Sequence, residues 1–139
     1  MGHATNLYGI ISNPVGPQKD LIWAENLKVI NSLPDEDHEF PWISNRMFSK
    51  EFQPGWDERH IHFAANYKNL ESDLRRWVDK FERLLSKLMW LSATVHIETF
   101  HTGEFEVNWN IHEDNLKEWS RHDWLPTTKW VSEGLIKKG

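Results

Sequence analysis

Two pairs of metal-ligating residue types stand two positions apart in this sequence of 139 residues. The first pair is His60 and His62, and the second is His96 and Glu98. Side chains two positions apart on a β-strand point to the same face of a sheet, so each pair presents two ligands together. Imidazole nitrogens and carboxylate oxygens bind zinc and related divalent metals, which activate water for hydrolysis. One hypothesis is therefore a small metal-dependent, hydrolase-like enzyme with its site on a sheet.

A metal-free acid–base pair is a variant of the same idea. His96 with Glu98, or His62 with Glu106, would supply the proton donor and acceptor. A surface hydrogen bond between His and Glu needs no function, however, and eight histidines in one chain also produce a His-x-His pair by chance. The sequence has no cysteine, no Gly-rich phosphate loop, no Gly-x-Ser-x-Gly elbow and no His-Glu-x-x-His helix. We therefore favour a non-enzymatic protein that needs no cofactor, with a divalent metal as the alternative.

Three segments alternate in polarity like half-buried strands and must position these residues. In 60–67, 91–100 and 104–112 most odd-numbered residues are apolar and most even-numbered residues are polar. A short apolar run at 7–11 predicts a further strand. Segments 20–33 and 70–88 carry apolar residues at spacings of three and four, which is typical of amphipathic helices.

These elements predict a single α+β domain over residues 1–139. We expect a two-layer sandwich, with an antiparallel sheet carrying two helices on one face, as a variant of the ferredoxin-like fold. A short edge strand is expected at 46–49, a turn at 53–57 and a frayed end at 137–139. If the helices cover the apolar face, the even-numbered side chains share the opposite face. The plain alternative to a site there is a face that is merely solvated.

The charge balance restricts the classes of partner. Lys and Arg number 16 against 21 Asp and Glu, so the formal charge is −5. This balance opposes binding to nucleic acid, which needs basic groups against phosphates, and to an anionic membrane surface. No stretch approaches the roughly 18 apolar residues that a membrane-spanning helix needs. We expect a cytoplasmic protein with a protein partner, and a basic one suits its charge.

A protein-binding surface is the function that we favour at this point. Polar side chains on a rigid sheet suit the docking of a basic partner, and Trp is a common anchor of interfaces. The candidate partner-binding residues are Glu98, Glu106 and Asn108 of the sheet and Asp35, Asp37 and Trp42 of an acidic loop. The alternative for the loop is that its aromatic residues cover the edge of the core. Trp119, Trp124 and Trp130 pack either on the same chain or on a second copy, which leaves a homodimer open.

The stretch from His60 to Trp109 contains three familiar segments, namely Ile-His-Phe-Ala-Ala, Trp-Val-Asp-Lys-Phe-Glu-Arg-Leu-Leu and Val-His-Ile-Glu-Thr. It resembles small bacterial proteins, some of which are of the immunity or antitoxin type. The resemblance covers about a third of the chain, and its residues mostly determine the fold. It implies a protein that blocks the active site of a toxin with a complementary surface, often an acidic one against a basic nuclease. It carries over no functional residue.

Overall fold

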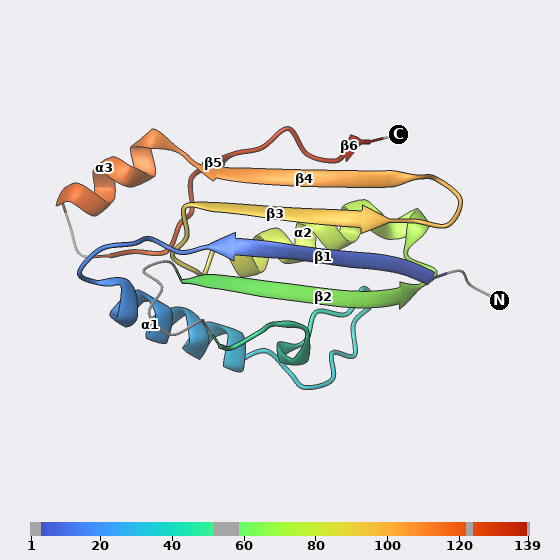
Figure 1. Ribbon diagram of the computed structural model, residues 1–139, viewed down its shortest axis with the longest axis horizontal. Coiled ribbons are helices and arrows are strands. Elements are labelled where there is room, and N and C mark those ends of the chain that lie inside the picture. Colours follow the sequence, from blue (N-terminus) through green and yellow to red (C-terminus); the bar gives the residue numbers. More distant parts are fainter. Residues whose placement is uncertain (1–3, 52–58, 122–123, 139) are drawn as a thin grey trace.

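The computed structural model describes residues 4–51, 59–121 and 124–138. Within these residues, six strands form one sheet with antiparallel pairing, and three helices accompany it (Figure 1). The strands are β1 (Ala4–Ser12), β2 (His60–Lys68), β3 (Ser92–Glu98), β4 (Glu104–Ile111), β5 (Trp130–Val131) and β6 (Ile136–Lys137). The helices are α1 (Lys19–Asn31), α2 (Leu74–Leu85) and α3 (Glu113–Arg121). The strand order is β2-β1-β3-β4-β5, and β6 also pairs with β4. The predicted α+β class is confirmed.

Alternation along the strands separates a buried face from a solvent-facing one. Ile61, Val95 and Val107 have no exposed surface, although they come from three different strands. β1 follows the same rule, since Ile11 is buried while Tyr8 is 43% exposed. Odd-numbered residues therefore enter the core and even-numbered ones face out, as the period-two pattern predicts.

Helix α2 supplies the centre of the buried layer and lies behind the sheet in Figure 1. Its residues Trp77 and Phe81 are fully buried, and their rings stack with centroids 4.8 Å apart. The Phe81 ring also contacts Phe63 of β2, at 5.0 Å, and Trp109 of β4, at 5.3 Å. Because each aromatic side chain buries a large apolar area, these contacts hold α2 on the sheet.

Helix α1 joins the same core from beside the β2 edge (Figure 1). Its residues Trp23 and Ile30 are buried in the cluster that contains the α2 aromatics. The buried side chain of Asn26 donates a hydrogen bond to the Met89 carbonyl and accepts one from the Met89 amide, each at 2.8 Å. This reciprocal pair fixes α1 against the segment that follows α2. Both predicted helices exist and contribute to one core.

The predicted edge strand at 46–49 is wrong. Asn45–Met47 forms a turn of 3-10 helix, and Phe48 makes only an isolated antiparallel bridge to Phe63. The physical reason is the side chain of Asn45, which donates a hydrogen bond of 3.0 Å to a backbone carbonyl just after α1 and so curls the segment toward that helix. A single bridge does not make a strand, and the ferredoxin-like part of the fold prediction is not confirmed.

The end of the chain is more ordered than the sequence predicts. Lys137 pairs with Phe105 in the register of β6 with β4, and the Lys138 amide donates a hydrogen bond of 2.7 Å to the Glu104 carbonyl. The expected fraying is therefore wrong for 137–138, because the free edge of β4 offers backbone partners. The turn expected at 53–57 lies outside the described residues.

No helix in residues 4–51, 59–121 or 124–138 is both long enough and apolar enough to span a membrane.

Candidate functional site

Even-numbered side chains of four strands lie on the face opposite α2. Because α2 lies behind the sheet in Figure 1, this face is turned toward the viewer. The strand register aligns them in rows across the sheet. The central row runs Ala64, Tyr8, His96, Glu106, and the row beside it runs Asn66, Asn6, Glu98, Glu104. We call the open face the surface formed by Asn6, Tyr8, Thr94, His96, Glu98, Glu104, Glu106 and Asn108.

Glu106 is the centre of a hydrogen-bond network on the open face. Its carboxylate accepts a hydrogen bond from the Asn108 amide at 3.1 Å and lies 3.3 Å from the Lys138 ammonium and 3.3 Å from His96 Nδ1. Thr94 holds Asn108 in turn, by donating to its amide oxygen at 2.8 Å. The hydrogen bond from Asn108, followed by that from Lys138, lowers the pKa of Glu106. The carboxylate is therefore charged and fixed in place at neutral pH.

Tyr8 is the aromatic side chain of the open face. Its ring stacks on His96 with centroids 5.3 Å apart, and its hydroxyl donates to the Glu98 carboxylate at 3.4 Å. The negative charge of Glu98 raises the pKa of Tyr8, with a smaller contribution in the same direction from Glu104. This part of the open face therefore has a negative electrostatic potential. The sequence analysis did not name Tyr8 as a site residue. The alternation in the first strand, where the neighbouring Leu7 is buried, already indicates that Tyr8 faces outward.

The four residues predicted to ligate a metal do not come together. β1 lies between β2, which carries His60 and His62, and β3, which carries His96 and Glu98. The rings of His60 and His62 are 6.3 Å apart, while His96 pairs with Glu106 across the β3–β4 register. Across residues 4–51, 59–121 and 124–138, no group of three or more His, Asp or Glu side chains could hold a metal ion. The geometry also pairs His96 with Glu106, whereas the sequence suggested His96 with Glu98 or His62 with Glu106 as an acid–base pair.

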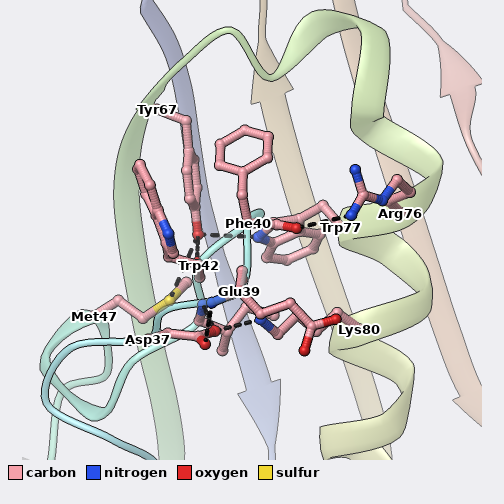
Figure 2. Close-up of polar contacts among 10 residues, drawn as sticks. Asp37, Glu39, Phe40, Trp42, Met47, Tyr67, Arg76, Trp77 and Lys80 are labelled. Atoms are coloured by element: carbon pink, nitrogen blue, oxygen red, sulfur yellow. Dashed lines mark hydrogen bonds and ion pairs between the residues drawn. The ribbon is translucent and has the colours of Figure 1, made fainter.

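The acidic loop is tied to α2 through Asp37, as Figure 2 shows. Asp37 forms an ion pair with Lys80, and both side chains are less than a fifth exposed. The carboxylate also accepts the amides of Ile43, at 3.0 Å, and Glu39, at 3.1 Å. Partial burial alone would raise the pKa of Asp37, but the hydrogen bonds from Lys80 and the two amides outweigh burial and lower it. Asp37 is thus a structural anchor of the loop.

A second set of contacts fastens the aromatic end of the same loop (Figure 2). The Tyr67 hydroxyl donates to the Trp42 carbonyl and accepts a hydrogen bond of 3.1 Å from the Trp77 indole. Burial raises the pKa of Tyr67 to about 12. The Trp42 ring remains 47% exposed, and the Asp35 carboxylate accepts the Asn45 amide at 2.6 Å. The backbone of the loop is therefore held against the body of the domain.

The tryptophans near the end of the chain pack on this same chain. The Trp119 and Trp124 rings meet edge to face at 4.9 Å, and the Trp119 indole donates to the Leu125 carbonyl at 2.8 Å. Trp130 contacts the fully buried Trp90, with ring centroids 5.8 Å apart. All three therefore have intramolecular partners.

Comparison of the chain with protein-family models, with curated proteins and with solved structures finds no match.

The coupling between Tyr8 and Glu98 leads to a first prediction. In Glu98→Gln the pKa of Tyr8 should fall, because the charge that opposes formation of the phenolate is removed. The chain has two tyrosines, and Tyr67 titrates near 12, so the first phase of an ultraviolet absorbance titration belongs to Tyr8. Tyr8→Phe should delete that phase and Glu36→Gln should leave it unchanged. Equal midpoints in the wild type and Glu98→Gln would contradict the contact.

Proposed function

We propose that this chain is a non-enzymatic protein-binding domain, of the immunity type that its sequence resembles, and that it docks a basic protein surface on the open face. The first support is that this face is already ordered without a partner. Glu106 is held by Asn108, Lys138 and His96, and Tyr8 is held between His96 and Glu98. A pre-ordered surface loses little side-chain entropy on binding.

The observation that carries the proposal is the pairing of Glu98 with Glu104. These residues are direct partners in the β3–β4 register, so both carboxylates lie side by side on the open face. Like charges in this position destabilise a sheet. A Lys or Arg from a partner would relieve the repulsion, so the two residues cost stability in the free protein and favour a cationic partner. The raised pKa of Tyr8 is a sign of the same local negative potential.

The other surfaces that the sequence suggested are weaker candidates for this role. The charge of Asp37 in the acidic loop is already neutralised by Lys80, so Asp37 is a poor contact for a cationic partner. The residues of the alternative metal site are divided between β2 and β3, with β1 between them. Both findings direct the proposal to the open face.

Charge reversal on the open face tests the proposal. The wild-type chain should capture a partner from lysates of cells that encode it. The double variant Glu98→Lys/Glu104→Lys should fail to capture that partner. With that partner purified, the association rate should fall about tenfold at low salt, because long-range attraction becomes repulsion. Stability should change by less than about 1 kcal/mol, since neither side chain is in the core. Capture followed by biolayer interferometry measures the first two effects, and urea denaturation measures the third.

A matched control has the same change in net charge at exposed loop positions away from the face, namely Glu36→Lys/Glu51→Lys. It should retain the partner. Loss of the partner with both double variants would mean that net charge alone governs binding. Retention by both, or capture of nothing by the wild type, would overturn the assignment to the open face.

A further inference from the structure

Two adjoining grooves lie on the helical side of the domain, away from the open face. The larger groove, of about 790 Å³, lies between α1 and the segments around Met89 and Pro126. The smaller, of about 290 Å³, lies between the end of α1, the acidic loop and α2. Val29 and Lys87 line both, so the two grooves meet at these residues. The larger groove falls within the range of roughly 300–1,000 Å³ that is usual for small-molecule sites.

The larger groove is suited to an apolar body. Leu21, Ile22, Val29 and Met89 line it, and Leu21 is 55% exposed. Asn26 is the buried polar residue of this lining, and both its amide nitrogen and its amide oxygen already have a hydrogen-bond partner in Met89. An alkyl or aryl group there would cover apolar surface without leaving this amide unpaired.

Two cations without an ion pair among the described residues, Arg83 and Lys87, lie where the grooves meet. Lys80 is neutralised by Asp37, and Glu25 of the larger groove pairs with Lys28 at 3.1 Å. The remaining charges are those of Arg83 and Lys87, both exposed and without an ion pair to any Asp or Glu of the described residues, and that of Glu39. The lining holds three cations and three anions in all, but among the charges left without an ion pair the two cations outnumber the single anion.

We propose that the paired grooves bind a small amphiphilic carboxylate, with its apolar body beside α1 and its carboxylate at Lys87 and Arg83. Apolar contact supplies most of the affinity, and the two cations select the sign of the head group. Lys87 is the residue that links the two parts, because it lines both grooves. This site is separate from the open face, so either one can fail without the other.

A series of straight-chain probes tests both halves of the proposal on the chain of residues 1–139. Isothermal titration with hexanoate, octanoate and decanoate should show saturable one-to-one binding that strengthens about fourfold for each added methylene. Octylammonium has the same number of carbon atoms as octanoate and the opposite charge, so it should bind at least about tenfold more weakly. Absence of saturable octanoate binding, equal binding of octylammonium or absence of a chain-length effect would each overturn the proposal.

Variants locate the site. Arg83→Glu/Lys87→Glu should weaken octanoate binding at least about tenfold, while Lys68→Glu/Lys117→Glu makes the same change in net charge elsewhere and should leave it within about twofold. Leu21→Asp should also weaken octanoate binding, and the fold should persist because an acidic residue suits the first turn of α1. If the Arg83/Lys87 variant does not fold, Lys87→Gln takes its place. Equal weakening by the Lys68/Lys117 control would show that only net charge matters and would contradict the site.

Discussion

Gly9→Ala is expected to destabilise the domain by about 3 kcal/mol or more, which is a large fraction of the stability of a small domain. A Cβ on Gly9 would lie 2.2 Å from the Thr94 carbonyl oxygen and 2.4 Å from the tip of the Phe63 ring. The first of these atoms belongs to the backbone of β3, which pairs with β1, so it cannot move without breaking the ladder. Glycine thus permits a close approach of backbone that no other residue allows. Urea denaturation followed by circular dichroism measures the loss.

The neighbouring residue provides the control for this effect. Ile10→Ala changes the adjacent, half-buried position on the other face of β1 and should cost only about 1 kcal/mol. The same adjacency of β1 and β3 allows Tyr8 to stack on His96 on the open face. If Gly9→Ala proved as stable as Ile10→Ala, the close approach of β1 to β3 would be refuted.

Lys80→Met is expected to have the second largest effect, a loss of about 2–3 kcal/mol of unfolding free energy. It leaves the Asp37 carboxylate, which is only 13% exposed, without its cation. Adding Asp37→Asn should recover part of the loss, because the amide no longer leaves a charge unpaired. A double-mutant cycle in urea measures the coupling between the two side chains. If the stability losses of Lys80→Met and Asp37→Asn were simply additive, the two side chains would have no coupling energy and the ion pair would not stabilise the fold.

Asp37 should also contribute to the acid sensitivity of the domain. Its pKa in the folded state is lowered, so the ionised form stabilises the fold. That stabilisation is complete above the unfolded-state pKa, which is near 4, and is lost as the pH falls through the lower pKa of the folded state. Unfolding free energies measured between pH 7 and pH 3 should therefore fall less in Asp37→Asn than in the wild type. An identical fall in both would contradict this role.

The two faces of the sheet have different roles, one in stability and the other in the proposed binding. The face covered by α2 carries the aromatic core, and the acidic loop is fastened to the same helix through Lys80 and Tyr67. The open face carries fixed polar groups and the facing carboxylates of Glu98 and Glu104. Because stability depends on the first face and the proposed binding on the second, substitutions on the open face can test function with little effect on folding.

The sequence by itself determined which residues alternate and therefore which face each side chain takes. Ile61, Val95 and Val107 are buried and His96, Glu98 and Glu106 face outward, because the period of two in a strand is a local property of the backbone. The second helix is equally clear, since the spacing of its apolar residues is also local. Local patterns of this kind predict the elements and the polarity of the open face.

Only the tertiary structure decided which strands are neighbours and which polar groups meet. It inserts β1 between β2 and β3, and so separates His62 from His96 and places Tyr8 in the central row. It pairs His96 with Glu106 and buries Asp37 against Lys80. These contacts join residues far apart in the chain, and their free energy comes from packing and charge pairing that no local periodicity encodes.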